Sequence, residues 1–336
     1  MMSRIRNIKD LAEIAGVSTG TVSRALADSP LISDRTRTRI KALAAEHGFR
    51  PNALARNLRI QRTGAIGVLI PLGHEAGQQI SEPFFITMLG LVADALSARG
   101  YDLLLSRVIP SGADWLDRFV DTGRVDGLIL IGQSDQWDAI ERVAAAYHPL
   151  VVWGAQQAGQ VHCSVGTDNA LGGRLAARHL IERGCRRLAF FGDPRAIEIA
   201  QRLEGLRSAA AEAGLGADAV TVLPAHLVAE AATPAIARFL DDTAHRPDGI
   251  LCASDVIAMS TLRALSEHGL AVPAEMRVVG FDGLPLGEQT VPRLTTVRQD
   301  LNRGAGLLVD KLVRRIGGEE TAPITMPPEL VVRMSS

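Results

Sequence analysis

The chain has 336 residues, of which 47% are hydrophobic, and its formal net charge is −1. This length exceeds that of a usual single domain, and the apolar content excludes an intrinsically disordered chain. No apolar run approaches the roughly 20 residues of a membrane span, and the N-terminal residues lack the apolar segment of a secretory signal. We therefore expect a cytoplasmic protein without a membrane partner. The three cysteines, Cys163, Cys185 and Cys252, lack metal-ligand spacing, so we expect reduced buried thiols and neither a metal nor another cofactor.

The charge is unevenly distributed along the chain. Residues 1–63 contain 12 Lys and Arg against 5 Asp and Glu, whereas residues 64–336 carry a net charge of −8. A small basic segment on a larger acidic body is typical of a nucleic-acid-binding head, because Lys and Arg gain affinity by releasing phosphate counterions. A basic head also suits RNA or an acidic lipid surface, and the motif within it favours DNA.

Residues 8–26, IKDLAEIAGVSTGTVSRAL, have the pattern of a helix-turn-helix. Gly16 suits the turn because glycine tolerates a positive φ, and Ser18 is a good N-cap for the second helix. The outer face of that helix is small, polar or cationic, and such a face fits the major groove of DNA. An ordinary surface corner of two helices has the same pattern, so the motif alone leaves that alternative open. The residues predicted to contact DNA are Ser18, Thr19, Gly20, Thr21, Ser23 and Arg24.

A third helix and a basic linker follow. We expect the helix to be capped by Ser33 or Asp34 and to end at His47-Gly48, which completes a headpiece over residues 1–50. Residues 51–63 are helix-competent and basic, but they contain too few apolar side chains for a core helix. A lone helix of this length needs a partner to be ordered, so we interpret this segment as a hinge helix with a linker.

From residue 64 onward, short apolar runs alternate with amphipathic segments. The expected strands are residues 65–71, 101–106, 126–132, 150–154, 187–193, 219–223, 249–254 and 277–282. The expected helices are residues 84–99, 113–122, 135–147, 168–183, 200–213, 229–242, 255–268 and 301–316, before a last strand near Leu330–Arg333. Nearly continuous apolar strands separated by helices predict a parallel, doubly wound α/β architecture. We expect residues 64–336 to form two such subdomains that divide near Val161–Gly166.

Taken in order, these segments resemble the LacI/GalR family of bacterial transcriptional regulators. The similarity runs through IKDLAEIAGVSTGTVSRAL, PNALARNLR, VDGLILIG, GTDNALGGRLAARHLIERG, CASDVIAMSTLRAL and VVGFDGLPLGEQTVPRLTTVRQD. The resemblance implies a helix-turn-helix headpiece, a hinge helix that folds on operator DNA, and a core like the type I periplasmic sugar-binding proteins. It also implies a homodimer on a palindromic double-stranded operator, since the two-fold symmetry of the protein matches that of the DNA.

The resemblance further assigns roles in DNA binding. Arg24 is the candidate for reading a base, because a guanidinium can bind guanine through two hydrogen bonds. Leu58 falls where the family inserts a leucine into the minor groove at the operator centre, although a buried hinge leucine would give the same sequence. Asn52, Arg56 and Arg59 complete the predicted contacts in the hinge, with the arginines placed on phosphates rather than on bases.

In this family a small-molecule effector binds between the two subdomains, outside the carboxyl ends of the strands. The resemblance carries over Phe84 and Phe85 as an aromatic wall, together with Arg202, Asp282 and Gln299, and it adds Gln133, Trp153 and Asp255 as weaker candidates. Trp153 equally suits packing in the core, and Asp168 and Asp255 equally suit helix capping. A carboxylate, an arginine and aromatic rings favour a neutral polyol. We therefore expect a mono- or disaccharide inducer that releases a repressor from DNA.

Three alternative functions compete with a repressor that a sugar releases from DNA. In a corepressor mechanism, as in purine-responsive members of that family, the ligand strengthens DNA binding, and the sequence does not set the sign because both mechanisms use the same domain closure. An enzyme is disfavoured because the chain lacks the GxGxxG, GxxxxGK[ST], GxSxG and HExxH motifs. An exported binding protein is disfavoured by the basic head. Since no leucine heptads follow the last helix, we expect a dimer rather than a tetramer.

Overall fold

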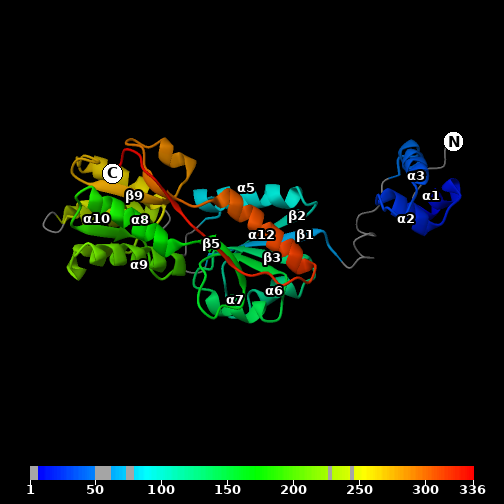
Figure 1. The fold of residues 1–336 in the computed structure, drawn as a ribbon, viewed down its shortest axis with the longest axis horizontal. Coiled ribbons are helices and arrows are strands. Elements are labelled where there is room, and N and C mark those ends of the chain that lie inside the picture. Colours follow the sequence, from blue (N-terminus) through cyan, green and yellow to red (C-terminus); the bar gives the residue numbers. More distant parts are fainter. Residues whose placement is uncertain (1–6, 50–61, 73–78, 226–228, 243–245) are drawn as a thin grey trace. The chain divides into compact units, whose positions relative to one another are not determined.

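The computed structural model describes residues 7–49, 62–72, 79–225, 229–242 and 246–336 (Figure 1). Its contacts divide the chain into two units, Met1–Thr63, which we call the head, and Gly64–Ser336, which we call the core. The four hinge residues predicted to contact DNA lie outside the described residues: Asn52, Arg56, Leu58 and Arg59.

The head is a bundle of three helices, α1 (Ile8–Ala15), α2 (Thr19–Leu26) and α3 (Asp34–Glu46). The predicted turn is confirmed, because α1 ends at Gly16 with a φ of 62°, a left-handed conformation that glycine adopts without strain. Ser33, one of the two predicted caps, is the N-cap of α3. The three helices bury one small apolar core, made of Leu11, Ala12, Ala15, Val22, Ala25, Ile40 and Ala44.

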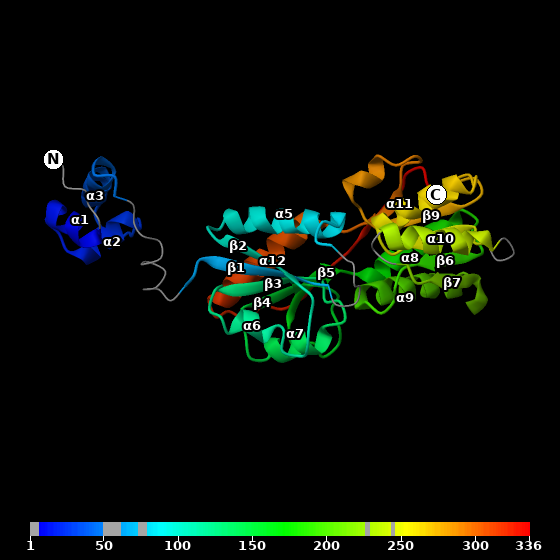
Figure 2. The same cartoon turned by 180° about the vertical axis from the view of Figure 1, so that it is seen from behind.

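The core consists of two α/β lobes (Figure 2). The first lobe has a six-stranded sheet of order β11-β5-β4-β3-β1-β2, in which all paired strands are parallel. Helices α5 and α12 cover one face of this sheet, and α6 and α7 cover the other. Its elements are β1 (Ala65–Pro71), α5 (Pro83–Ser97), β2 (Asp102–Val108), α6 (Asp117–Val120), β3 (Gly127–Ile131), α7 (Trp137–Ala144), β4 (Leu150–Trp153), β5 (Cys163–Thr167), α12 (Leu301–Ile316) and β11 (Ile324–Met326).

The second lobe repeats this arrangement with a sheet of order β12-β10-β9-β8-β6-β7. All its pairs are parallel except β10 with β12. Its elements are α8 (Asn169–Glu182), β6 (Leu188–Phe191), α9 (Ile197–Glu212), the 3-10 helix η1 (Ala217–Ala219), β7 (Val220–Leu223), α10 (Ala229–Asp241), β8 (Gly249–Cys252), α11 (Asp255–Glu267), β9 (Arg277–Asp282), the 3-10 helix η2 (Pro285–Glu288), β10 (Thr295–Arg298) and β12 (Glu329–Val331). The central strands are buried on both faces, which explains their continuous apolar sequences.

The predicted doubly wound fold is confirmed, but the predicted boundary between the subdomains is wrong. Residues 161–166 overlap β5, which pairs with β4 and belongs to the first sheet, so the chain crosses to the second lobe after Thr167. Strands β5, β10 and β11 were not predicted, because they are short and contain Ser, Thr or Gly in place of a continuous apolar run. The chain crosses twice more, from β10 to α12 and from β11 to β12. Three crossing segments therefore join the lobes.

Candidate functional site: a helix-turn-helix head and an interlobe cleft

The outer face of α2 carries the residues of the head that were predicted to contact DNA. Ser18 is the N-cap of α2, and its hydroxyl accepts a hydrogen bond from the amide of Thr21 at 3.1 Å. Thr19 and Arg24 are exposed, whereas Gly20, Thr21 and Ser23 are partly buried. Because Val22 and Ala25 face the head's core, the exposed groups share the opposite side of the helix, as docking in a groove requires.

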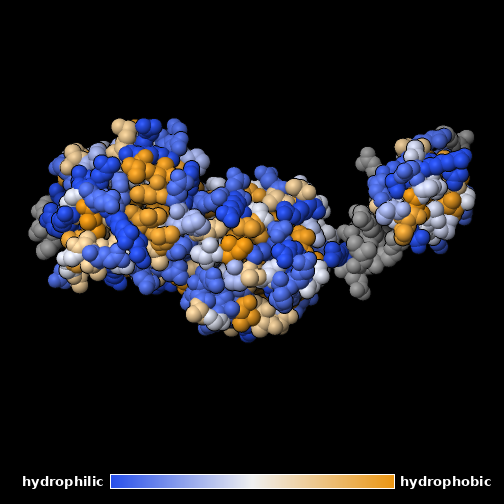
Figure 3. Space-filling view, in the orientation of Figure 1, coloured by the Kyte–Doolittle hydropathy of each residue, from blue (hydrophilic) through white to orange (hydrophobic). Residues whose placement is uncertain are grey.

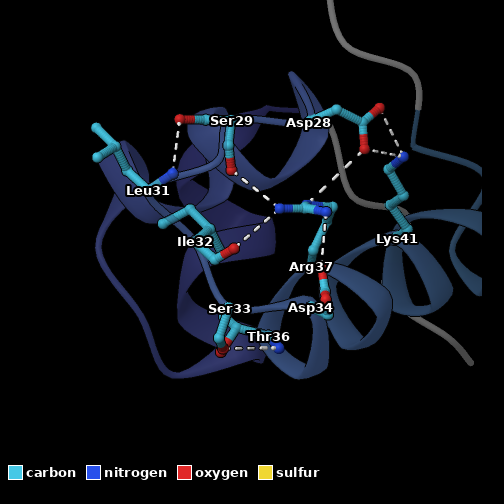
Figure 4. A network of polar contacts seen from close by, with 9 residues as sticks. All are labelled: Asp28, Ser29, Leu31, Ile32, Ser33, Asp34, Thr36, Arg37 and Lys41. Carbon is cyan, nitrogen blue, oxygen red and sulfur yellow. Dashed lines mark hydrogen bonds and ion pairs between the residues drawn. The ribbon is translucent and has the colours of Figure 1, made fainter.

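Arg37 of α3 fixes the loop that joins α2 to α3 (Figure 4). Its Nη2 donates to the carbonyl oxygens of Ser29 at 3.1 Å and Ile32 at 3.0 Å, and its Nη1 donates to Asp34 at 2.8 Å. The loop carbonyls thus have a charged donor in place of water, which makes these hydrogen bonds stronger than neutral ones. The loop therefore holds α2 in a defined orientation on α3.

A second contact in the same loop joins Asp28 to Lys41 of α3. The Lys41 ammonium donates to both carboxylate oxygens, at 2.6 and 2.8 Å, and this hydrogen bonding lowers the pKa of Asp28 below its usual value. Asp28 has a φ of 54°, in the left-handed region that Asp tolerates better than most residues. The pair is exposed, so it orients the loop more than it stabilises the head.

A cleft lies between the two lobes of the core, at the carboxyl ends of their strands. It encloses about 680 Å³ of space, including the part that is open to solvent. The first lobe contributes residues that follow β1, β3 and β4, and the second lobe contributes the start of α9 and the ends of β8 and β9. Six of the eight predicted ligand residues line it: Phe84, Phe85, Gln133, Trp153, Arg202 and Asp282.

Aromatic side chains form the wall of the cleft on the first lobe. The rings of Phe84 and Phe85, at the start of α5, meet edge to face with their centroids 5.5 Å apart. Trp153, at the end of β4, is 5% exposed and packs against Gly304 of α12, where a Cβ would lie only 2.3 Å from the ring. Trp153 therefore packs in the core of the first lobe and also lines the cleft, the two positions that the sequence left open.

Arg202 is the centre of the opposite wall. Its Nε donates to Asn169 at 2.8 Å, its Nη1 donates to the carbonyl of Ala253, and its guanidinium lies 3.7 Å from the centroid of the Phe281 ring. Nη1 also lies 3.9 Å from the carboxylate of Asp282. Burial lowers the pKa of Arg202, and the Asp282 carboxylate opposes that shift. The guanidinium is thereby held in one orientation, with Nη2 outside these contacts.

Asp282 lines the cleft and contacts Gln299, which lies in the segment that crosses between the lobes from β10 to α12. The residue ends β9 with a φ of 118°, a strained value for a residue with a side chain, of the kind that clusters at binding sites. Its Oδ1 accepts a hydrogen bond from Nε2 of Gln299 at 2.8 Å. Burial raises the pKa of Asp282 to about 6, although Arg202 and Gln299 favour the ionised form.

Gln299 and Asp255, the two remaining predicted ligand residues, are not part of the lining of this cleft. Asp255 is fully buried and accepts from the hydroxyl of Thr296 at 2.6 Å and the amide of Leu284 at 2.7 Å. It therefore ties β9 and β10 together. The predicted alternative of helix capping is also wrong for Asp255, because Ser254 is the N-cap of α11, whereas Asp168 does cap α8.

Sequence reasoning missed Glu198, which lines the cleft from the second residue of α9. Its Oε1 accepts from the amide of Ala155 at 3.2 Å and from Nε2 of Gln133 at 3.3 Å. The predicted helix began at residue 200, which left Glu198 in a loop, whereas α9 begins at Ile197. The spacing of Glu198 and Arg202, one helical turn apart, was the available signal. Glu82, Ser134 and Ser254 also line the cleft and were not predicted.

Two negative findings concern the described residues alone. Within those ranges, no group of three or more His, Cys, Asp or Glu side chains is arranged to hold a metal ion. No helix in the same part of the chain has the length and apolar character needed to cross a membrane.

A helix-turn-helix head joined to a two-lobed core with an interlobe cleft defines a DNA-binding transcriptional regulator. The family model for bacterial regulatory proteins of the lacI family matches residues 7–52, and a periplasmic binding protein-like domain matches residues 177–336. The transcriptional regulator CelR of Thermobifida fusca is 32% identical over 97% of this chain and 96% of its own. The chain therefore belongs to the lacI family of bacterial regulatory proteins.

Other relatives agree with this placement. The transcriptional repressor PurR of Proteus mirabilis is 31% identical over 98% of this chain and 96% of its own. A CelR–cellobiose complex has 30% identity and a TM-score of 0.70, covering 99% of this chain and 100% of that one. A Lac repressor dimer bound to operator and the anti-inducer ONPF has 26% identity and a TM-score of 0.84, covering 98% of each chain. The protein is a transcriptional repressor and not an enzyme, as predicted.

Proposed function

We propose that this repressor leaves a palindromic operator when a small neutral sugar, a mono- or disaccharide, binds the interlobe cleft. The observation that carries the proposal is the pairing of two unlike walls, aromatic rings on one lobe and the Arg202–Asp282 pair on the other. Aromatic faces cover the C–H side of a sugar ring, and charged groups orient its hydroxyls. The similarity to a CelR–cellobiose complex supports the same class of ligand.

In this proposal the operator is contacted by the head, residues 1–50, and by the hinge, residues 51–63, whereas the core, residues 64–336, senses the effector. Arg24 reads a guanine, and Leu58 enters the minor groove at the operator centre. Ligand-driven closure of the core changes whether two hinges can fold side by side on DNA. The remaining proposed contacts are those of Ser18, Thr19, Gly20, Thr21, Ser23, Asn52, Arg56 and Arg59.

The repressor is proposed to act as a cytoplasmic homodimer. Its second lobe exposes Leu286, Val291, Val332 and Met334, with Val291 95% exposed, and Figure 3 shows hydrophobic side chains gathered on this lobe around its C-terminal segment. Edge strand β2 of the first lobe adds the exposed Leu104 and Leu105. Apolar patches of this kind mark association surfaces, and the similar Lac repressor structure is a dimer on operator DNA. Light scattering on the pure protein is expected to give a dimer, and a stable monomer or tetramer would contradict it.

The sign of the response is tested by titration. Operators are first selected from random DNA by the full-length protein, and mono- and disaccharides are then titrated against the complex in a fluorescence anisotropy assay. Release of the operator by a sugar is the expected result. Tightening of the complex by the ligand, for example by a nucleobase, would instead establish the corepressor mechanism.

The Arg202→Ala variant tests the location of the site. Removing the guanidinium is expected to abolish the ligand response while operator binding persists, because the head and hinge are unchanged. Persistent operator binding also shows that the variant is folded. A ligand response that survives in Arg202→Ala would place the effector outside the cleft.

A further inference from the structure

Glu198 and Arg202 project into the cleft from the same side of α9, four residues apart. Their charges are compensated differently. The Arg202 guanidinium faces the Asp282 carboxylate at 3.9 Å, whereas Glu198 forms no ion pair within the part of the chain that the structure describes. Its Oε1 accepts only the two long hydrogen bonds from Ala155 and Gln133, and its Oε2 takes part in neither.

Gln133 supplies a second acceptor beside Glu198. The side chain is fully buried, and its Nε2 donates to the carbonyl of Ala155 at 2.8 Å as well as to Glu198. It is packed flat on Gly154, where a Cβ would lie 2.0 Å from Nε2, so the amide is fixed in place. Its Oε1 is buried without a hydrogen-bond partner among the described residues. A buried acceptor in a cleft lining without a donor indicates that a ligand supplies one.

The charge of the lining points to the same class of ligand. Two carboxylates of the second lobe, those of Glu198 and Asp282, line the cleft together with one guanidinium, that of Arg202, so these three groups carry a net charge of −1. A carboxylate or phosphate entering this cleft would lose its hydration and meet like charges at short range, where the reduced dielectric strengthens repulsion. Hydroxyl and ammonium groups would instead donate to the acceptors already present.

We propose that Glu198 is a specificity-determining residue, which makes the cleft accept neutral and amino sugars and reject sugar phosphates and sugar acids. This inference rests on the proposed sugar response of the same cleft. Glu198 selects by accepting a hydrogen bond from a hydroxyl or ammonium group of the ligand and by repelling anionic substituents. The Arg202 guanidinium does not attract anionic ligands strongly enough to reverse this preference, because the Asp282 carboxylate already neutralises its charge.

The test uses sets of matched probes on the full-length protein. Each neutral mono- or disaccharide is compared with its 6-phosphate, its uronic or aldonic acid and its 2-amino-2-deoxy analogue, first by thermal shift and then by titration calorimetry. Neutral and amino sugars are expected to raise the melting temperature, whereas the acidic analogues are not. In Glu198→Gln, which keeps the shape and removes the charge, the affinity ratio of amino to acidic analogue is expected to fall at least about tenfold.

Glu204→Gln is the matched control, because Glu204 lies on the same helix and is exposed. Its affinity ratio is expected to equal that of the wild type. Preferential binding of an acidic analogue by the wild type, or an unchanged ratio in Glu198→Gln, would overturn the inference and leave a sugar-responsive repressor in place. If no sugar of any charge raises the melting temperature, the proposed function fails as well. That outcome differs from the failure of the inference alone, in which neutral sugars still raise the melting temperature.

Discussion

The two lobes of the core have the same strand order but opposite chemistry at the cleft. Strands β1 to β5 of the first lobe correspond to β6 to β10 of the second, and the lobes differ in their last strands, since β11 runs parallel to its neighbour and β12 antiparallel. The second residue of the first helix after the leading strand is Phe84 in α5 and Glu198 in α9. Strand β4 of the first lobe ends with Trp153, and the corresponding strand of the second lobe, β9, ends with Asp282.

Two lobes of one topology thus present different groups to a ligand in the cleft. Apolar area gives affinity without direction, so the aromatic lobe suits any ring-shaped ligand of the right size. Buried charges and acceptors bind only groups that complement them, so in the proposed function the charged lobe determines which ligand remains bound. Each prediction below perturbs one lobe and leaves the other intact.

The largest effect is expected from Gly173→Ala in the charged lobe. Helices α8 and α9 approach so closely that a Cβ at Gly173 would lie 2.0 Å from the carbonyl oxygen of Arg202. The methyl group must push the backbone of α9 away, and overpacking of this kind costs about 3 kcal/mol. Urea denaturation is expected to show that loss. Gly90→Ala on α5 is the control, because no atom lies within 4 Å of its added Cβ. Equal midpoints for the two variants would contradict the close packing of α8 on α9.

The next effect concerns the pH dependence of stability. Burial raises the pKa of Asp255 from its usual value of 3.8 to about 8, with the nearby Asp282 carboxylate as a second cause. The folded state therefore holds a proton that the unfolded state releases near pH 4, so this stabilisation is present at low pH and is lost as the pH rises toward 8. Asp255→Asn, which has no proton to lose, is expected to flatten the decline in the free energy of unfolding between pH 5 and about 8. A decline as steep as that of the wild type would assign the titration to another group.

The sequence predicted the aromatic lobe's wall better than the charged one. Phe84 and Phe85 were carried over from the resemblance, and Trp153 was singled out because the chain has only three tryptophans and this one ends a core strand. Arg202 and Asp282 were also found through the resemblance, which carries them over as ligand contacts. The role of Asp255 was predicted incorrectly, because its local sequence does not reveal its bond to Thr296, a residue 41 positions further along the chain.

The same reasoning explains which parts of the fold were predicted. The central strands, such as residues 127–131 and 277–282, are continuous apolar runs because helices cover both of their faces. Strand β10, Thr-Thr-Val-Arg, is held in the sheet by its neighbours rather than by its own apolar character. The start of α9 was misplaced by three residues because no side chain caps it, and that error concealed Glu198.

A smaller effect is expected from Gly304→Ala behind the aromatic wall. The added Cβ would lie 2.3 Å from the ring of Trp153, so the indole must tilt and the cleft surface must change. We expect a weaker affinity for every sugar that binds, because the displaced indole no longer presents the same surface to the ligand. Gly306→Ala on the same helix is the matched control, since no atom lies within 4 Å of its Cβ, and its affinity is expected to be unchanged. Equal affinities in both variants would mean that Trp153 packs in the core without touching the ligand.

The smallest effect is expected from Phe84→Ala, and it separates the two walls most directly. The ring is half-buried against Phe85, so its loss removes apolar contact with the ligand but no charge and no hydrogen bond. Affinity is expected to fall by about 1 kcal/mol for neutral and amino sugars alike, and the heat capacity change of binding should become less negative in titration calorimetry. The ratio between charged and uncharged ligands should stay constant, whereas Glu198→Gln changes that ratio. If Phe84→Ala altered the ratio instead, the aromatic lobe would also select for charge, and the division of work between the lobes would be wrong.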